Sequence, residues 1–528
     1  MNRSLYRALL IVSFLGLNAI ILFGIGSIWS YFNTGADRAS ILHVQEELNQ
    51  VYRPKITWED TKNEGRPMER QTREAIEKDY LSAWYVRNIA LETNSLFGIA
   101  DYYTDSARLK LHDILDINRK SGTNLKTTTI EHRPKLEFYS EDGKLVVLTD
   151  KNVLTYQEVY SAGVPISKGK SIATYQVMLL LEDGFWRIRH MVKIPNENQL
   201  EQVQKDLKLE SISKIRGVNY YPQQTPWNMY GTSYNKEVVS EDFRTVQELG
   251  LNTLRLFVPY EAFGQATIEP QKLNQLEHTL NIAQAFDLKV IITLFDFYGD
   301  YGVRDWTLTH RHAEQIVTRL KNHKALLAWD IKNEPDLDFD TRGKEKVLAW
   351  LEQMISNMNQ WDNSHPVTIG WSNPEAATNL SQKVDFVSFH YYREASGFSK
   401  AFQFLRNKVP NRPLVLQEFG YSSYDGIWNA FSGSEKDQAT YHQEMQKILK
   451  EEHIPFLFWT LYDFKEIPTS VVGKLPWRKA RQKYFGILDS DRNPKTSHAI
   501  IGKSVKNEKG TANQTVPLSA QPNLKSMP

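Results

Sequence analysis

Two glutamates of this 528-residue chain follow short apolar runs of the kind that form buried strands. Glu334 lies in WDIKNEPD (329–336), and Glu418 lies in LVLQEFG (414–420). The proline after Glu334 and the glycine two residues after Glu418 punctuate the ends of these runs. One glutamate at a strand end is commonly only a surface charge, but two in matching places could face each other across a single cleft.

A facing pair of carboxyl groups suits the cleavage of a glycosidic bond. One carboxylic acid donates a proton to the leaving oxygen, and the other carboxylate attacks the anomeric carbon to form a covalent glycosyl intermediate. A separation of about 5–5.5 Å predicts retention of configuration, whereas roughly 6.5–9.5 Å predicts inversion. The pair therefore predicts a glycosidase, with both stereochemical outcomes open at this point.

The two glutamates belong to a segment in which apolar strands alternate with amphipathic helices. Eight strand-like runs are spaced along it: 214–222, 252–258, 288–297, 326–335, 366–372, 385–392, 412–420 and 455–464. This alternation predicts parallel strands joined by helical crossovers, and eight of them predict a closed (β/α)8 barrel over residues 212–500. A doubly wound open sheet is disfavoured, because no glycine-rich phosphate loop follows the first run.

Polar and aromatic side chains stand at the carboxyl ends of these predicted strands, where barrels of this kind gather their functional residues. In chain order they are Arg255, Asp296, Asn333 with Glu334, His390 with Tyr392, Glu418, and Trp459. Barrel closure places the fourth and seventh strands on opposite sides of one mouth. We therefore expect Glu334 and Glu418 to meet there.

Because of these strand-end residues, residues 212–490 resemble glycoside hydrolase clan A. Within that clan they resemble the cellulase and mannanase branch, which is glycoside hydrolase family 5. The motifs that carry the resemblance are Asn-Glu-Pro on strand four, Glu on strand seven, Arg on strand two, His-x-Tyr on strand six and Trp on strand eight. The resemblance implies a retaining mechanism. In that mechanism Glu334 would be the acid/base and Glu418 the nucleophile.

The resemblance also implies roles for the surrounding residues. Asn333 would hydrogen-bond the sugar 2-hydroxyl, and the positive charge of Arg255 would hold the nucleophile ionised. His390 and Tyr392 would lie around the site, with Tyr392 contributing the hydroxyl near the nucleophile. Trp459 would be the platform beneath the reacting sugar.

One position departs from the family pattern. Many such hydrolases have a His at the end of strand three, where this chain has Asp296 or Phe297. Substrate contact and a purely structural loop role are both open for Asp296. Other tryptophans could stack on sugars or pack between barrel and helices: Trp227, Trp306, Trp371 and Trp428.

No metal or cofactor is predicted. The chain contains no Cys, which excludes thiolate ligands, disulfides and cysteine nucleophiles. Three Asp alternate in DLDFD (336–340), but the Gly at position six and the Glu at position twelve of a calcium loop are missing. The pair of His in HRH (310–312) lacks a third ligand. The 64 basic and 62 acidic residues nearly balance, so a nucleic-acid partner is not indicated.

The N-terminal segment 1–36 is predicted to be a membrane anchor. Residues 8–36 carry no charge, and the apolar stretch within them is about twenty residues long, enough to span a bilayer. Arg3 and Arg7 precede it, which favours a cytoplasmic N-terminus. The protein would then cross the cell membrane once, with its catalytic domain on the extracytoplasmic side. A long cleaved signal peptide is the alternative. Residues 37–68 are predicted to be a linker.

Residues 69–196 are predicted to form a small α+β domain, because helical periodicity gives way to alternating strands with Asp-Gly turns. FGIADYYTDSARLKL (97–111) and EDGFWRIRHM (182–191) resemble the cone-shaped fold of the nuclear transport factor 2 superfamily. That resemblance implies a binding role, with a protein partner or a second copy of the chain. Residues 503–528 are polar without periodicity and are predicted to be a disordered tail.

The leading prediction is thus a membrane-anchored retaining β-glycoside hydrolase that cleaves a β-linked glucan or mannan. A transglycosylase acting on an exported polysaccharide would use the same residues, with a sugar hydroxyl in place of water. A non-catalytic polysaccharide-binding or assembly protein is the alternative of a different class.

Overall fold

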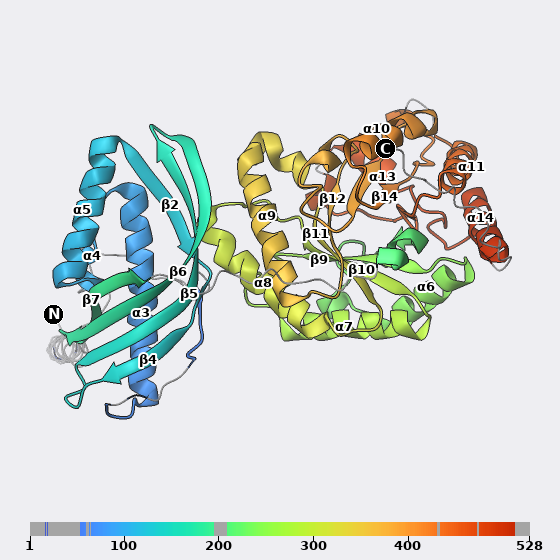
Figure 1. The fold of residues 1–528 in the computed structure, drawn as a ribbon. Helices are drawn as coiled ribbons and strands as arrows, with labels where there is room; N and C mark the ends of the chain where they lie inside the picture. Colours follow the sequence, from blue (N-terminus) through green and yellow to red (C-terminus); the bar gives the residue numbers. More distant parts are fainter. Residues whose placement is uncertain are drawn as a thin grey trace, which may run out of the picture. The chain divides into compact units, whose positions relative to one another are not determined.

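A computed structural model describes residues 53–59, 63, 65–194, 209–429, 433–472 and 475–512, together with Gly16 and Asn18. The chain divides into two compact units, Met1–Gln199 and Leu200–Pro528 (Figure 1). Among the described residues no helix is both long and apolar enough to cross a bilayer. The predicted anchor at 1–36 lies outside them, apart from Gly16 and Asn18, so it stays a prediction.

The first unit places helices before an antiparallel sheet, as expected for residues 69–196. Its helices are α3 (Arg70–Thr93), α4 (Ile99–Tyr102) and α5 (Asp105–Ser121). Its sheet has the order β2-β5-β6-β7, with β4 paired to β5; the strands are β2 (Thr123–Thr129), β4 (Pro134–Tyr139), β5 (Leu145–Ser161), β6 (Val164–Glu182) and β7 (Phe185–Ile194). A two-residue strand β1 (Lys55–Ile56) pairs with β3 (Glu131–His132).

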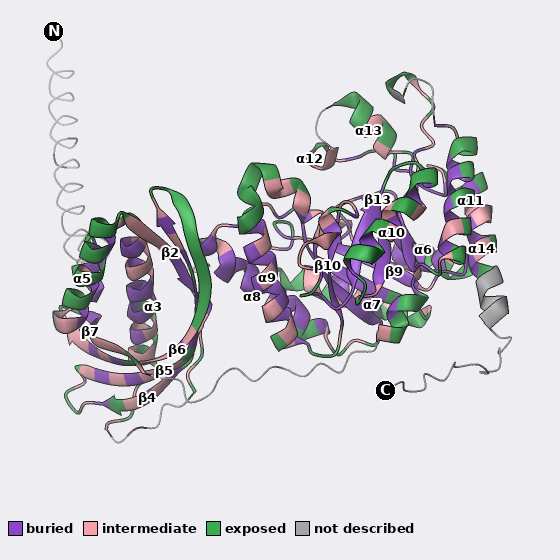
Figure 2. Cartoon of the chain, turned by 45° about the horizontal axis from the view of Figure 1, so that its top comes forward, coloured by how far each residue is buried: buried purple, intermediate pink, exposed green. Residues whose placement is uncertain are grey.

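The curved sheet wraps around α3 (Figure 2), and their shared core is rich in aromatic residues. Tyr80 and Trp84 of α3 are fully or almost fully buried, and Trp186 of β7 packs in the same cluster. The α+β organisation is therefore present. The resemblance to the nuclear transport factor 2 superfamily stays a prediction.

The second unit is a closed barrel of eight parallel strands, which confirms the (β/α)8 barrel part of the predicted fold. Its strands are β8 (Arg216–Asn219), β9 (Thr253–Pro259), β10 (Lys289–Asp296), β11 (Leu326–Asn333), β12 (Val367–Trp371), β13 (Val387–Tyr391), β14 (Leu414–Phe419) and β15 (Phe456–Phe458). Each strand pairs in parallel with the next, and β15 pairs with β8 to close the barrel.

Helices follow most of the strands: α6 (Lys236–Glu248), α7 (Pro270–Ala285), α8 (Trp306–Leu320), α9 (Lys344–Trp361), α10 (Phe398–Lys408), α11 (Glu435–Glu451) and α14 (Thr496–Ala512). The connection from β12 to β13 is an exception, since it contains only the 3-10 turn η7 (Ala376–Thr378). Two short helices, α12 (Thr469–Val472) and α13 (Pro476–Gln482), lie in the long connection after β15.

Apolar side chains fill the barrel below the site. Ile291, Ala328, Val415 and Leu457 come from four different strands and share one buried cluster with Ile212 of the turn that precedes β8. Strands covered on both faces are near-continuously apolar, which is why the sequence runs were recognisable. A rigid floor of this kind fixes the side chains at the strand ends above it.

The predicted disordered tail is wrong at its start. Helix α14 continues through Lys503 to Ala512, and Val505 is buried. Val505 and the aliphatic part of Lys506 lie against Gly250 at the end of the α6 connection. Earlier in the same helix Ile501 and Ser497 are fully buried, so the part of α14 after residue 502 extends a helix that is already packed.

Candidate active site

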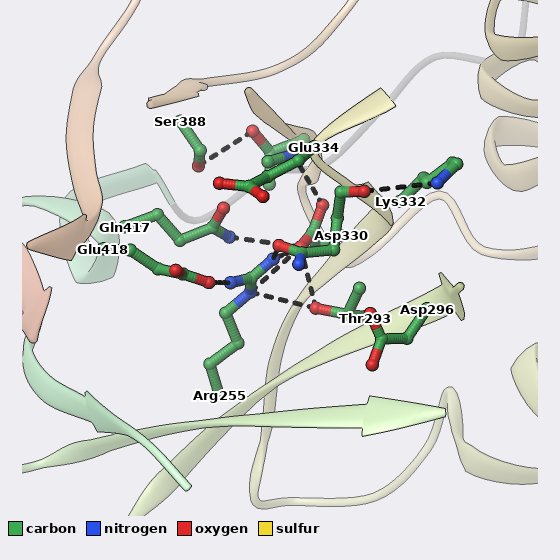
Figure 3. Close-up of polar contacts among 12 residues, drawn as sticks. Arg255, Thr293, Asp296, Asp330, Lys332, Glu334, Ser388, Gln417 and Glu418 are labelled. Atoms are coloured by element: carbon green, nitrogen blue, oxygen red, sulfur yellow. Dashed lines mark hydrogen bonds and ion pairs between the residues drawn. The ribbon is translucent and has the colours of Figure 1, made fainter. Parts of the chain in front are cut away.

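Arg255 of β9 is the centre of a buried polar cluster inside the barrel mouth (Figure 3). Its Nε and Nη2 donate to Asp330 Oδ2 at 3.0 and 2.6 Å, and Nη2 also donates to Asn333 Oδ1 at 2.9 Å. Nη1 donates to Asn219 Oδ1 and to Glu418 Oε1. A guanidinium with five donors in a fixed fork can orient several strand ends at once, which a lysine cannot do.

Glu418, on β14, has a donor on each carboxylate oxygen. Arg255 occupies Oε1, and the hydroxyl of Tyr392 donates to Oε2 at 2.7 Å. The neighbouring Tyr391 instead donates its hydroxyl to the carbonyl of Glu394. The choice of Tyr392 for the hydroxyl beside the predicted nucleophile therefore agrees with the geometry.

Glu334 stands directly after β11 with a left-handed backbone, φ 47° and ψ 51°. Residues other than Gly rarely adopt this conformation, and it costs free energy. Here it turns the side chain toward His390, whose Nδ1 lies 2.8 Å from Glu334 Oε1. One oxygen of Glu334, one oxygen of Glu418 and one ring nitrogen of His390 all lie within 4.8 Å of one another.

The electrostatics of this trio favour a proton on His390 over a proton on Glu334. Burial disfavours the charged form of His390, but the carboxylates of Glu418 and Glu334 outweigh burial and raise the His390 pKa above 6.5. Burial opposes the charge of Glu334 too, yet the His390 hydrogen bond and the charges of His390, Arg255 and Lys332 lower the Glu334 pKa below 4.5. Between these limits His390 is charged and Glu334 ionised.

A cavity of about 760 Å³ lies above the two carboxylates. Asn333, Glu334, Tyr392, Glu418 and Trp459 line it, whereas Arg255 and His390 are fully buried beneath. Aromatic rings form much of the remaining wall: Tyr221, Trp227, Phe257, Tyr421 and Phe485. Flat rings beside paired carboxylates suit the apolar faces of pyranose sugars.

Trp459 follows β15 and packs at the cavity wall. Its ring centroid lies 5.7 Å from that of Trp227 and 6.3 Å from those of Tyr221 and Phe257. These contacts fix the indole on one side and leave part of its surface to the cavity. That position fits the sugar platform expected from the sequence.

Asp296, whose role was open, lines the cavity and is almost fully buried. It accepts a hydrogen bond from the Tyr221 hydroxyl at 3.0 Å. Burial raises the Asp296 pKa to about 6, although Tyr221, Lys332 and Arg255 favour its charged form. Phe297 follows with a left-handed φ of 60° and also lines the cavity. Both residues at the position that departs from the family pattern thus line the cavity.

The other four tryptophans considered above differ in burial and in their position relative to the cavity. Trp306 and Trp371 are buried and belong to packing, Trp227 lines the cavity, and Trp428 is exposed. Residues missed by the sequence reasoning include Asn219 of the neighbouring strand β8 and Asp330 of β11, two strands away, both of which accept hydrogen bonds from Arg255. Their signal was a polar residue interrupting an apolar strand run, as in the second residue of WDIKNEP.

Residues 214–465 match the family described as cellulase, glycosyl hydrolase family 5. Mannan endo-1,4-beta-mannosidase 5 of Solanum lycopersicum is 23% identical over 256 residues, which are 40% of this chain and 57% of that protein. Beta-glucuronidase of Mus musculus is 23% identical over 315 residues, which are 54% of this chain and 43% of that protein.

This chain therefore spans about half the length of the curated relatives that it matches. A solved GH5_18 structure from Streptomyces cattleya in complex with Manb1-4GlcNAc is 14% identical, with a TM-score of 0.47, over 57% of this chain and 81% of that one.

Proposed function

We propose that this chain, whose barrel is an O-glycosyl hydrolase domain of the retaining clan A type, cleaves a β-linked mannan or glucan. The observation that carries the proposal is the approach of Glu334 and Glu418 to within 4.8 Å at the carboxyl ends of β11 and β14. That spacing is close to the roughly 5–5.5 Å of retaining enzymes and shorter than the roughly 6.5–9.5 Å of inverting ones, which favours double displacement.

In the first step an oxygen of Glu418 attacks the anomeric carbon, while the leaving oxygen takes a proton from Glu334. The bond between the anomeric carbon and the leaving oxygen breaks, and a glycosyl ester forms on Glu418. In the second step Glu334 removes a proton from water, which attacks the same carbon and releases Glu418. Arg255 and Tyr392 hold the nucleophile through both steps.

His390 supplies the proton that Glu334 donates. In the free site the raised pKa of His390 and the lowered pKa of Glu334 favour the proton on His390, whose Nδ1 lies 2.8 Å from Glu334 Oε1. As the negative charge of Glu418 disappears into the glycosyl bond, one of the two charges that favour protonated His390 is lost. The proton then moves along the hydrogen bond to Glu334 and on to the leaving oxygen.

Mannan and glucan are proposed as substrates for two reasons. The matched relatives include several proteins named mannan endo-1,4-beta-mannosidase, and the family model is named for cellulase. A cavity of about 760 Å³ with many aromatic rings in its wall also suits a polysaccharide better than a single sugar. The anchor proposed at residues 1–36 would hold this domain on the outer side of the cell membrane.

A panel of β-linked mannans, glucans and xylans tests the proposal with the purified full chain. We expect shortened products from a mannan or a glucan and none from a xylan, with retained anomeric configuration by NMR of the first product. Products longer than the input would instead establish transglycosylation. A folded protein that releases nothing from any polymer would overturn the proposed function.

The pH dependence of kcat/KM should show a basic limb above pH 6.5. The acid proton is held by the Glu334–His390 pair, and the pKa of His390 is raised above 6.5. Activity is therefore present while the pair is protonated and is lost as pH rises through the pKa of the pair. A pH–rate profile on the polymer identified by the panel measures this limb, and a midpoint below pH 6 would contradict it.

Tyr392→Phe should lower kcat/KM by about 10- to 100-fold, because a hydrogen bond to a charged group contributes about 1.5–3 kcal/mol. The ring remains, so the loss isolates the hydroxyl that donates to Glu418. Tyr391→Phe is the matched control, since its hydroxyl donates only to a backbone carbonyl. Steady-state kinetics compare the two, and equal losses would contradict the assignment.

A further inference from the structure

One wall of the cavity comes from the connection after β15, which carries α12 and α13. Val471 and Val472 of α12, Arg481 and Gln482 of α13, and Phe485 line the same cavity as Glu418. Figure 2 shows α12 and α13 projecting from the body of the barrel, with much of α13 exposed. This wall is thus placed to contact a polymer that runs out of the cavity.

The segment that supplies Arg481 and Gln482 to this wall is basic. The segment 475–484, LPWRKARQKY, contains four cations and no carboxylate. Arg478 and Arg481 are exposed, while Lys479 donates to Thr469 Oγ1 at 2.9 Å. The chain as a whole is nearly neutral, so this run is a local departure from its average charge.

The cavity wall contains other charged residues, but one is an arginine already paired with a glutamate and another is a carboxylate. Arg393 forms a two-point ion pair with Glu375, both contacts at 3.0 Å. No carboxylate among the described residues forms such a pair with Arg481. Glu394 adds a carboxylate to the lining, so cationic recognition falls to the α13 side.

Exposed indoles stand beside these arginines. Trp477 of α13 is 45% exposed and Trp428 of the neighbouring turn η9 (Ile427–Asn429) is 47% exposed, with their ring centroids 6.1 Å apart. Two large exposed rings side by side form an apolar patch, and such patches often mark a binding surface. Rings next to arginines can hold a sugar face while the guanidinium groups bind a carboxylate on the sugar.

We propose that Trp428, Trp477, Arg478 and Arg481, the basic rim, bind acidic groups on the polysaccharide beside the bond that is cleaved. The substrate is then a β-linked polysaccharide that carries carboxylate substituents or uronic acid residues. This inference rests on the proposed function and names its substrate class. A polysaccharide is favoured over a lipid surface because Arg481 is continuous with the cavity that contains Glu418.

The experiment uses β-1,4-mannan and β-1,4-glucan, each neutral and carboxymethylated to the same degree, with the full chain. The parent should show a kcat/KM about tenfold higher on a carboxymethylated polymer than on its neutral counterpart. The preference should disappear at about 1 M NaCl, where the Debye length is about 3 Å. The double variant Arg478→Gln/Arg481→Gln should lose the preference at low salt.

The matched control is Arg406→Gln/Lys447→Gln, which removes two exposed cations from the outer helices α10 and α11. This control should keep the parent's preference. If the parent cleaves neutral and acidic polymers equally, or the control loses the preference as well, the basic rim does not read acidic groups. The proposed glycosidase function would survive that result.

Binding separates the two proposals where no polymer is cleaved. Glu418→Gln protein, titrated with the same polymers by calorimetry, should bind the carboxymethylated forms more tightly, and the added rim substitutions should abolish the difference. Equal binding would overturn the rim. Loss of binding to phosphatidylglycerol vesicles in the rim variant, with polymer preference unchanged, would also overturn it and assign the surface to a membrane.

Discussion

Glu418→Ala should lower kcat by about 10⁴-fold or more, because no other group can form the glycosyl ester. The fold should persist, since Arg255 keeps Asp330, Asn333 and Asn219 as partners after the glutamate is removed. Hydrolysis rates on the polymer selected by the panel measure the loss. Circular dichroism and thermal unfolding establish that the variant is folded.

Added azide gives this prediction a stereochemical readout. In Glu418→Ala the small anion can enter the space of the missing carboxylate and attack the anomeric carbon directly, so the product is an α-glycosyl azide. Glu444→Ala removes an exposed glutamate on α11 and should behave as the parent does. A β-azide from Glu418→Ala, or full activity without azide, would remove Glu418 from the nucleophile's role.

Glu334→Ala should show a loss that depends on the leaving group. Without its acid the enzyme should cleave a natural polysaccharide about 10²- to 10⁴-fold more slowly. An aryl glycoside with an acidic phenol needs little proton donation, so its first step should be nearly preserved. Hydrolysis of the glycosyl ester on Glu418 should be slow in this variant, because Glu334 also activates the water.

A burst of phenol followed by slow turnover is therefore expected in Glu334→Ala, measured by stopped-flow absorbance. Azide should accelerate the second step and give a β-glycosyl azide, since it attacks the covalent intermediate. His390→Gln removes the residue that carries the proton in the free site but keeps Glu334. Its hydrolysis rate on the polysaccharide should therefore fall less than that of Glu334→Ala. Equal loss on both classes of substrate in Glu334→Ala would contradict the acid/base role.

Much of the site was predictable because most of its residues lie near or directly after the end of an apolar run, whereas Arg255 lies inside β9. The strand runs were long enough to count, and barrel closure then determines which ends face one another. Arg255, Glu334, His390, Tyr392, Glu418 and Trp459 were all named on this basis and lie together in the structure. Their roles stay predictions until the variants are measured.

Features that depend on three-dimensional support could not be predicted in this way. Asp330 looks like an ordinary polar residue in the sequence, and only the register of β9 against β10 and β11 brings it to Arg255. The basic rim lies in a connection without periodicity, so its approach to the cavity depends on tertiary packing. The part of α14 after residue 502 was predicted to be disordered because its one buried apolar residue, Val505, produces no periodic pattern.

The left-handed backbone of Glu334 has a consequence for engineering the thermal stability of this chain. A non-glycine residue held in that region costs on the order of 1–3 kcal/mol, and a glycine would relieve it. Screens that select only for heat resistance would therefore favour glycine or asparagine at position 334 and discard the acid. Activity and thermostability thus make opposing demands on this one backbone position, and stabilising substitutions are better sought elsewhere in the barrel.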